Sequence, residues 1–221
     1  SGQDFAALAE ASGRGFIAPH LAGHGNSPLL GPCSMAGEAA RLSPILTLWS
    51  APPLLLGYSL GGRTALSWAC ADPASFAALI LIGASPGLDE AEEREARRAS
   101  DQLLAERIAS AGVPAFADFW EETPIISSQA NIPEPYGSAL RARRRRCSTA
   151  GLVSSLEGMG TGRMPSLWSE LTALPLPTLL LTGASDAKFC GIAEAMHARL
   201  PHAVHSIVEE AGHCCHLEQP E

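Results

Sequence analysis

The chain has 221 residues, of which 46% are hydrophobic and 17% charged, and this composition is ordinary for a globular enzyme with one sizeable core. Its net charge of −8 argues against a general nucleic-acid-binding protein, because such proteins need basic surfaces. The longest apolar stretch, 76–84, is far too short to cross a bilayer, which argues against membrane insertion.

The first 87 residues alternate between helical and strand patterns, which predicts the first part of an α/β core. Strands are expected at 15–19, 53–56 and 78–83. Helices are expected at 4–11, 34–49 and 60–71, and Asp72-Pro73 ends the last of them. The segment 22–32 is rich in glycine and proline and is expected to be a loop.

A Gly-x-Ser-x-Gly sequence joins the strand at 53–56 to the helix at 60–71. It reads Gly57-Tyr58-Ser59-Leu60-Gly61-Gly62. In this strand–turn–helix context the pattern is typical of a nucleophile elbow, a sharp turn that exposes the serine hydroxyl at the mouth of a pocket. The glycines leave room for the turn, and the start of the helix favours negative charge near the serine. We therefore predict that Ser59 is the reactive residue of an enzyme.

Residues 88–170 carry helical patterns and no convincing strand. Helices are expected at 89–111, 114–121, 136–158 and 165–174. An all-helical insertion in an α/β core is the layout of a cap that shapes the substrate pocket and excludes water. We therefore divide the chain into a first core part (1–87), a helical cap (88–170) and a second core part (171–221).

Two further strands, at 178–183 and 203–208, are followed by candidate partners for the serine. Asp186 comes after the first of these strands and His213 after the second. Because the carboxyl ends of parallel strands meet at one edge of a sheet, Ser59, Asp186 and His213 can converge in one crevice. Their order along the chain is that of α/β-hydrolases. In such a triad His213 takes the serine proton, and Asp186 orients the imidazole and stabilises its charged form.

Other polar residues are weaker candidates. Asp89 follows a different strand and is the reserve acid. The tetrapeptide 213–216 (HCCH) lacks the spacers that let side chains surround one zinc ion, so we expect no metal site. Six cysteines, two of them adjacent, indicate reduced thiols and a cytoplasmic protein. The elbow has neither a dinucleotide-binding nor a P-loop pattern, so we expect no cofactor.

The elbow continues into Arg63, and six further segments are notable along nearly the whole chain. They are 23–27 (GHGNS), 84–88 (ASPGL), 93–97 (EREAR), 158–168 (GMGTGRMPSLW), 186–189 (DAKF) and 211–213 (AGH). Together and in this order, they resemble a family of menaquinone-pathway α/β-hydrolases, the 2-succinyl-6-hydroxy-2,4-cyclohexadiene-1-carboxylate synthases. This family favours the arginine after the elbow, and 158–168 is the most diagnostic stretch.

The resemblance implies an α/β-hydrolase fold, a mostly parallel sheet with helices on both faces, and a lyase in place of a hydrolase. The family substrate is a small polycarboxylate, a cyclohexene with a succinyl group, a ring carboxylate and an enolpyruvyl ether. A proton is removed beside the succinyl ketone, and pyruvate is eliminated to give a cyclohexadiene. A serine deprotonated by His213 can act as the base, and the Leu60 amide can stabilise the enolate oxygen.

A substrate with three carboxylates needs cations, and guanidinium groups bind carboxylates with two hydrogen bonds. One of the implied arginines lies one helical turn after the serine, and another lies in the arginine-rich run at 141–146, most of which fits a solvated helix face equally well. Two aromatic residues match positions that line the pocket, although packing alone explains such residues too. The implied substrate-binding residues are Tyr58, Arg63, Arg97, Trp120 and Arg146.

Two departures and two alternatives accompany this interpretation. Compared with the family, both ends of the chain look truncated, because a second oxyanion donor would precede Ser1 and a final helix would follow Glu221.

The first alternative function is that of an esterase, thioesterase or carbon–carbon bond hydrolase of the same fold, in which Ser59 forms an acyl-enzyme. The second is a non-catalytic relative that binds a small acid.

Overall fold

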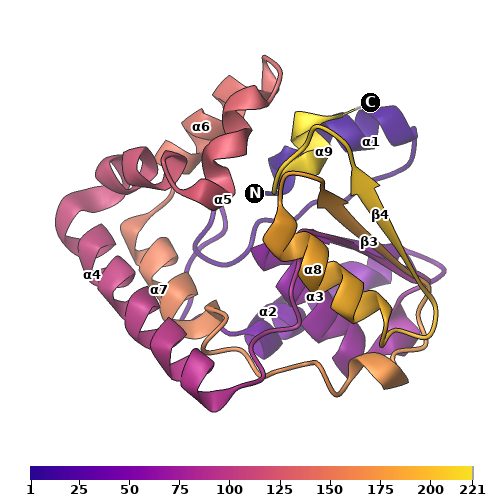
Figure 1. The fold of residues 1–221 in the computed structure, drawn as a ribbon. Helices are drawn as coiled ribbons and strands as arrows, with labels where there is room; N and C mark the ends of the chain where they lie inside the picture. The colour runs from indigo at the N-terminus through magenta and orange to yellow at the C-terminus, as the bar shows by residue number, and fades with distance from the viewer. Residues whose placement is uncertain (221) are drawn as a thin grey trace.

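The structure is a computed structural model and describes residues 1–220. It confirms the predicted α/β fold class, because a parallel sheet of four strands in the order β1-β2-β3-β4 lies among helices (Figure 1). The strands are β1 (Leu54–Tyr58), β2 (Ala78–Ile82), β3 (Thr178–Gly183) and β4 (Ala203–Val208).

The parallel arrangement brings the loops that follow β1, β2 and β3 to one edge of the sheet. In β1 and β2, Leu56 pairs with Ile80 and Tyr58 with Ile82. These strands are nearly continuous apolar runs, as expected of parallel strands that are covered on both faces. The segments after the strand ends therefore share one crevice, where ligands bind in open α/β sheets.

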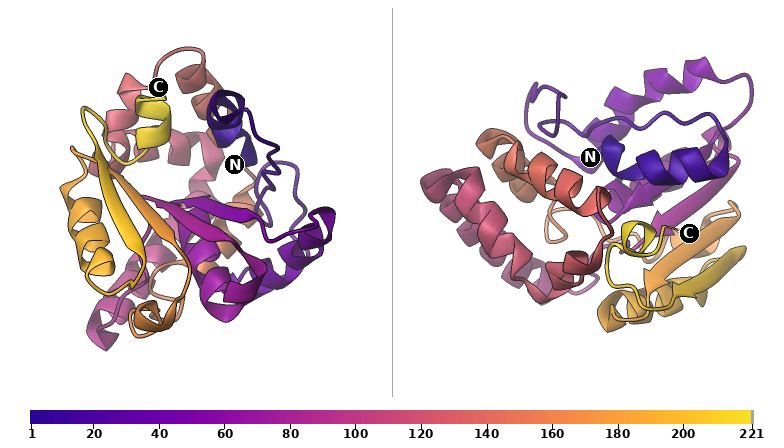
Figure 2. Two further views of the ribbon diagram at one scale, coloured as in Figure 1. Left: turned by 90° about the vertical axis from the view of Figure 1, so that its right-hand side faces the viewer. Right: turned by 90° about the horizontal axis from the view of Figure 1, so that it is seen from above.

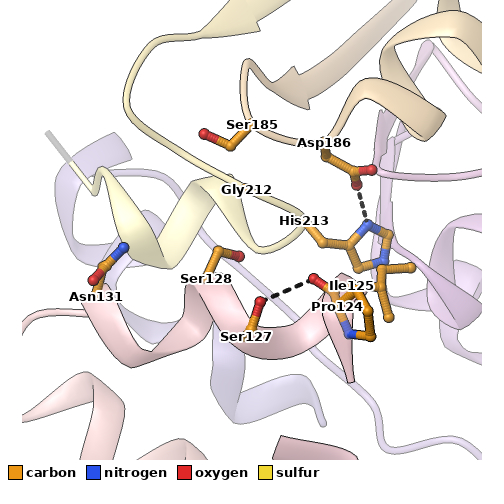
Figure 3. Close-up of a pocket in the computed structure, with 9 residues that line it drawn as sticks. All are labelled: Pro124, Ile125, Ser127, Ser128, Asn131, Ser185, Asp186, Gly212 and His213. Carbon is orange, nitrogen blue, oxygen red and sulfur yellow. Dashed lines mark hydrogen bonds and ion pairs between the residues drawn. The ribbon is translucent and has the colours of Figure 1, made fainter. Parts of the chain in front are cut away.

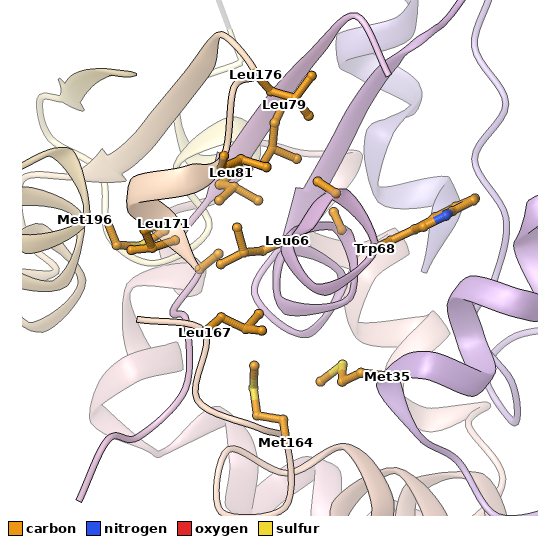
Figure 4. Packing of buried hydrophobic residues seen from close by; sticks show 14 of the residues in the cluster. Met35, Leu66, Trp68, Leu79, Leu81, Met164, Leu167, Leu171, Leu176 and Met196 are labelled. Carbon is orange, nitrogen blue, oxygen red and sulfur yellow. The ribbon is translucent and has the colours of Figure 1, made fainter. Parts of the chain in front are cut away.

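Each face of the sheet has its own apolar core, because successive side chains of a strand point to opposite faces. On one face, Leu79 and Leu81 of β2 belong to the larger core with Leu66 and Met196 (Figure 4). On the other face, Ile82 packs in a smaller cluster that includes residues near both ends of the chain. The covering helices are α3 (Leu60–Ala71) and α8 (Ala187–His197) on the first face, and η1 (Gly2–Phe5, a 3₁₀ helix), α1 (Ala6–Ser12) and α9 (Cys215–Glu218) near the second.

The described chain between β2 and β3 is helical and contains no strand. The helices of residues 91–159 gather on one side of the sheet, as the two further views also show (Figure 2). The longest, α4, is kinked at Gly112, whose φ of 81° and ψ of 170° are not helical, two residues before Pro114. The elements are α4 (Ala91–Glu121), α5 (Pro124–Ser127), η4 (Ser128–Asn131), α6 (Tyr136–Arg145), α7 (Thr149–Met159) and η5 (Leu171–Ala173).

The glycine-rich loop before α2 (Met35–Leu42) packs directly against α7, backbone to backbone. A Cβ atom at Gly151 would lie 1.9 Å from the carbonyl oxygen of Gly23, and one at Gly158 would lie 1.8 Å from that of Cys33. Only glycine permits such an approach, so α7 holds this loop in place. After α2 the chain continues through η2 (Ser43–Leu48) to β1.

The structure shows that three of the predicted elements were wrong. Residues 15–19 form no strand, because they pair with no described neighbour and leave Phe16 and Ile17 partly exposed. The helix expected at 136–158 is divided into α6 and α7, because the Ser148 side chain accepts a hydrogen bond from the Gly151 N–H and starts a new helix.

Residues 165–174 are mostly irregular, with only the short η5 in place of the expected helix. The Leu167 N–H donates to the carbonyl oxygen of Pro86 at 2.8 Å, and the Trp168 indole N–H donates to that of Gly87 at 3.2 Å. Both bonds hold this segment against the residues that follow β2, and only the first of them uses a backbone donor that a local helix would need. Of the helices in residues 1–220, none combines the length and apolar character that crossing a membrane requires.

Candidate active site

Ser59 stands in a strained turn between β1 and α3. Its φ of 50° lies in the left-handed region, and its N–H donates to the carbonyl oxygen of Ile82 at 2.9 Å, which holds the turn against β2. A Cβ at Gly57 would lie 2.3 Å from the Gly61 oxygen, and one at Gly62 would lie 2.6 Å from the Ala84 Cβ. The tight turn therefore needs glycine at positions 57 and 62, whereas Gly61 faces open space.

His213 lies between Ser59 and Asp186 and is hydrogen-bonded to both. Its Nε2 lies 3.0 Å from Ser59 Oγ, and its Nδ1 lies 2.7 Å from Asp186 Oδ2. The imidazole is buried, and the second Asp186 oxygen accepts the Phe189 N–H at 3.2 Å at the start of α8. This helix cap and the histidine together hold the carboxylate in one orientation.

Two glycines at strand ends make room for the histidine, and the sequence interpretation did not identify either role. A Cβ at Gly83 would lie 2.9 Å from His213 Cε1, and one at Gly183 would lie 2.2 Å from the Gly212 carbonyl oxygen. Gly83 also has a φ of 52°, which favours glycine. A glycine directly after a buried strand is the available sequence signal, but it does not reveal which neighbour needs the space.

Tyr58, the residue before the serine, packs its ring against two histidines. The ring centroids lie 5.3 Å from His213 and 4.8 Å from His216. Burial raises the pKa of the Tyr58 hydroxyl, which accepts a hydrogen bond from Gln129 Nε2 at 3.4 Å. The neutral tyrosine therefore packs beside the imidazole, and its role in substrate binding stays a prediction.

A cavity of about 350 Å³ opens beside His213 and Asp186 (Figure 3). Its other side is formed by α5 and η4, including the hydroxyl-bearing Ser127 and Ser128. The helical segment after β2 thus contributes directly to a space next to the triad residues. Asp89 does not line this cavity: it is exposed and accepts a hydrogen bond from Ser166.

Arg63 and Arg97 form a cationic cluster with Asp101 between α3, α4 and α7. Arg97 Nε donates to Asp101 Oδ1 at 2.8 Å, while Arg63 donates to the Met159 carbonyl oxygen. Burial, and then the Arg97 charge, lower the pKa of Arg63 to about 10, although Asp101 opposes this. Arg63 has no carboxylate within ion-pair distance among residues 1–220, so it retains the capacity to bind an anion.

Within residues 1–220, neither Trp120 nor Arg146 makes a hydrogen bond or a ring contact with Ser59, Asp186 or His213. The Trp120 ring lies 5.4 Å from that of Phe116 near the end of α4. Arg146 is exposed, and its Nε donates to the Ala142 carbonyl oxygen of its own helix. The substrate-binding roles of both residues stay predictions.

The other arginines of the run on α6 pair with carboxylates. Only some of them lie on an exposed helix face, as the sequence interpretation allowed for most of the run. Arg143 is largely buried and binds Asp4 at 2.6 Å, across 139 residues of chain. Arg144 contacts both Glu121 and Gln129, and so reaches the Tyr58 hydroxyl through one intervening side chain. These two arginines tie α6 to other elements, while the pairs made by Arg141 and Arg145 are exposed.

No group of His, Cys, Asp and Glu side chains suited to a metal ion is found among residues 1–220. In the tetrapeptide 213–216, the His216 ring is instead enclosed by Phe5 and Tyr58, and burial lowers its pKa to about 4. Burial likewise raises the pKa of the Cys214 thiol to about 12 and that of Cys215 to about 11. Both thiols are therefore protonated at neutral pH in the folded chain.

A serine on a strand-to-helix turn, with its histidine after the last strand of a parallel sheet, places the chain in the α/β-hydrolase class. The model of the alpha/beta hydrolase family matches residues 1–221. The chain is 35% identical, over 207 residues, to the 2-succinyl-6-hydroxy-2,4-cyclohexadiene-1-carboxylate synthase of Klebsiella pneumoniae (strain 342), which covers 90% of this chain. It is 43% identical, over 166 residues and 75% of this chain, to a Bacillus subtilis (strain 168) protein that bears the same name provisionally.

The solved structure of MenH from S. aureus matches the whole chain with a TM-score of 0.94 and 30% sequence identity, over 85% of the MenH chain. The chain therefore belongs to the 2-succinyl-6-hydroxy-2,4-cyclohexadiene-1-carboxylate synthase family of α/β-hydrolases, as the sequence motifs predicted. It spans 77% of the length of the Klebsiella relative and 61% of that of the Bacillus relative.

Proposed function

We propose that the chain eliminates pyruvate from 2-succinyl-5-enolpyruvyl-6-hydroxy-3-cyclohexene-1-carboxylate. The product is 2-succinyl-6-hydroxy-2,4-cyclohexadiene-1-carboxylate, an intermediate of menaquinone or phylloquinone biosynthesis. The observation that carries this proposal is the 3.0 Å contact between Ser59 Oγ and His213 Nε2 in a chain of this synthase family. A serine that can pass its proton to a histidine supplies the base that the elimination needs.

The proposed reaction conserves every proton and electron pair. His213 Nε2 accepts the Ser59 proton, and the serine oxygen removes the proton from ring C2, beside the succinyl ketone. The C2–H electron pair forms the C2–C3 double bond, the C3–C4 pair moves to C4–C5, and the C5–O bond breaks. The departing enolpyruvate takes the His213 proton and becomes pyruvate, and Ser59 keeps the substrate proton.

Negative charge develops on the ketone oxygen during this step and needs a donor. Leu60 is the first residue of α3, so its N–H has no acceptor within the helix. Leu60 follows the serine directly, and its N–H lies at the N-terminal, positive end of the helix dipole. We therefore assign the Leu60 amide to the enolate oxygen, a type of contact whose loss costs about 10²–10³ in rate.

The substrate carboxylates need positive partners and a site with little water. Arg63 and Arg97 lie close enough for their charges to interact, and Arg63 lies one turn after the serine. We assign this pair to a substrate carboxylate, because Arg63 is a buried guanidinium without a carboxylate partner and Arg97, although paired with Asp101, adds a second guanidinium beside it. We further propose that residues 88–170 act as a cap, which the contribution of α5 and η4 to the cavity beside His213 supports.

The proposed function is tested by measuring pyruvate release from the enolpyruvyl cyclohexene carboxylate with a coupled lactate dehydrogenase assay. An activated ester, such as p-nitrophenyl acetate, is measured in parallel, and Ser59→Ala is the control for both reactions. Fast pyruvate release with feeble ester cleavage is the expected result, and both should require Ser59.

The same assay separates the two alternative functions. Rapid ester cleavage without pyruvate release would overturn the lyase proposal in favour of a serine hydrolase that forms an acyl-enzyme. Binding of the substrate without either reaction would indicate a non-catalytic relative, and a fluorophosphonate probe would then leave Ser59 unlabelled.

A further inference from the structure

A buried glutamate holds both sides of the loop that carries His213. Glu218 of α9 is only 4% exposed. Its Oε2 accepts the Gly212 N–H at 2.6 Å, and its Oε1 accepts the Cys214 N–H at 3.0 Å. The two backbone donors belong to the residues immediately before and after the histidine, so one carboxylate fixes the backbone on which the imidazole stands.

The same carboxylate reaches the helical segment across the cavity. Ser128 Oγ, at the start of η4, donates to Glu218 Oε1 at 3.0 Å. The contact is close, because a Cβ at Gly212 would lie 2.1 Å from Ser128 Oγ. Glycine at position 212 therefore lets η4 approach the histidine loop, and Glu218 joins the two.

We propose that Glu218 is the positioning residue for His213, and that Ser128 couples this position to the helical segment between β2 and β3. The inference rests on the proposed function only in that His213 serves as the base for Ser59. Hydrogen bonds from backbone N–H groups to a buried carboxylate are stronger than those to a neutral acceptor. With three donors Glu218 is well satisfied, and removing it leaves two backbone N–H groups of the histidine loop without their acceptor.

The geometry that Glu218 protects has narrow tolerance. His213 must keep its 3.0 Å contact with Ser59 and its 2.7 Å contact with Asp186 at the same time. A displacement of about 1 Å in a catalytic group can cost about 10²-fold in rate. Loss of Glu218 should therefore lower the reactivity of Ser59 without removing any group that touches the substrate.

The experiment compares Glu218→Ala, Glu218→Gln and Ser128→Ala with the unaltered 221-residue chain. Glu209→Gln is the matched control, because it makes the same charge change at an exposed position of the same loop. Two rates are measured: pyruvate release, and covalent labelling of Ser59 by a fluorophosphonate. The labelling endpoint gives the fraction of active sites, so that each rate refers to correctly folded molecules.

We expect Glu218→Ala to lower kcat and the labelling rate together by about 10- to 100-fold, with KM changed by less than about threefold. Glu218→Gln keeps one acceptor oxygen and should fall between Glu218→Ala and the unaltered chain. Ser128→Ala should lower both rates less than either Glu218 variant, because it leaves both backbone bonds intact. Glu209→Gln should match the unaltered chain in both rates.

Several outcomes would overturn the inference. Unchanged rates per active site in Glu218→Gln would show that Glu218 only supports folding, and this variant decides the matter if Glu218→Ala fails to fold. A selective increase in KM would mean that Glu218 acts on substrate binding. The labelling rate does not require the lyase reaction, so failure of pyruvate release alone leaves the test valid. An unaltered chain with unreactive Ser59 would overturn the inference, because there would be no activated serine to position.

Discussion

At the scale of single residues, Ser59 is held in a backbone conformation that serine disfavours. Its φ of 50° and ψ of −111° are sparsely populated by residues with a Cβ, at a cost of about 1–3 kcal/mol. The hydrogen bond to Ile82 and the close packing at Gly57 and Gly62 keep the turn in place. The strain directs the hydroxyl toward His213 and away from the helix that follows.

This strain predicts that Ser59→Ala and Ser59→Gly will differ in stability. Ser59→Ala keeps the Cβ and the strain, whereas Ser59→Gly relieves the strain and adds chain entropy only to the unfolded state. We expect Ser59→Gly to exceed Ser59→Ala in free energy of unfolding by about 1 kcal/mol, measured by urea denaturation. Turnover should be lost in both. Equal stability of the two variants would argue that the turn is unstrained.

Arg97 should affect a carboxylate substrate far more than a neutral ester. Replacing it with alanine removes one of the two clustered guanidinium groups, so we expect KM for the enolpyruvyl substrate to rise by about tenfold or more. Cleavage of p-nitrophenyl acetate should change little. Arg145→Ala is the control, because Arg145 forms an exposed pair with Asp118. An equal loss in both reactions would contradict a role in carboxylate binding.

His216 makes the stability of the chain sensitive to mild acid. Burial lowers its pKa from 6.5 to about 4, so the unfolded state binds a proton over a range where the folded state does not. The free energy of unfolding should therefore fall as pH falls from 6.5 to about 4, and this contribution should level off below. In His216→Phe, the free energy of unfolding should depend less steeply on pH over this range. The decrease in slope should correspond to roughly one fewer proton taken up on unfolding, as measured by urea denaturation at several pH values.

The control for this titration is His202→Gln, which changes an exposed histidine outside the cluster. Comparison with it separates the loss of His216 from the loss of any one imidazole. An unchanged slope in His216→Phe would mean that His216 is protonated in the folded state, against the enclosure by Phe5 and Tyr58.

At the scale of elements, the packing at the junction of β1 and α3 depends on Gly62 more than on the adjacent Gly61. A Cβ at Gly62 would meet the Ala84 Cβ at 2.6 Å, but a Cβ at Gly61 would meet nothing within 4 Å. Gly62→Ala should therefore destabilise the chain by about 1–3 kcal/mol. Gly61→Ala should stabilise it by up to about 1 kcal/mol, because alanine favours a helix. Thermal unfolding of both variants measures the difference, and a reversed order would contradict the packing of α3.

The helices between β2 and β3 are tied to η1, β1 and α9 by polar side chains. Arg143 binds Asp4, and Arg144 binds Gln129, whose amide reaches Tyr58. Glu218 adds a further tie through Ser128. These contacts meet around Tyr58 and His213, so a shift of the helical segment acts directly on the residues beside Ser59.

At the scale of the whole molecule, stability comes mainly from the larger core between the sheet, α3 and α8. Leu81 is 1% exposed within this core, whereas Leu30 is 84% exposed in the glycine-rich loop. Leu81→Ala should lower the free energy of unfolding by about 2–5 kcal/mol through lost burial and the resulting cavity. Leu30→Ala should change it by less than about 0.5 kcal/mol. Similar effects of the two substitutions in urea denaturation would contradict the assignment of this core.

Local patterns in the sequence were sufficient to predict the α/β class, all four strands of the sheet and the elbow. The reason is that buried parallel strands are short apolar runs, and that the elbow has its own turn chemistry. Residues 15–19 and 165–174 were assigned wrongly, because their structure depends on partners elsewhere in the chain. The first segment lacks a neighbouring strand, and the second bonds to Pro86 and Gly87.

The sequence by itself determined the family and the order Ser59, Asp186, His213, because short motifs and their succession are properties of the linear chain. Only the tertiary structure decided that Gly62 is tightly packed and Gly61 is not, that Arg143 pairs with Asp4, and that Glu218 accepts hydrogen bonds from the loop of His213. Each of these depends on atoms brought together from distant elements, and pairing across 139 residues leaves no trace in local periodicity.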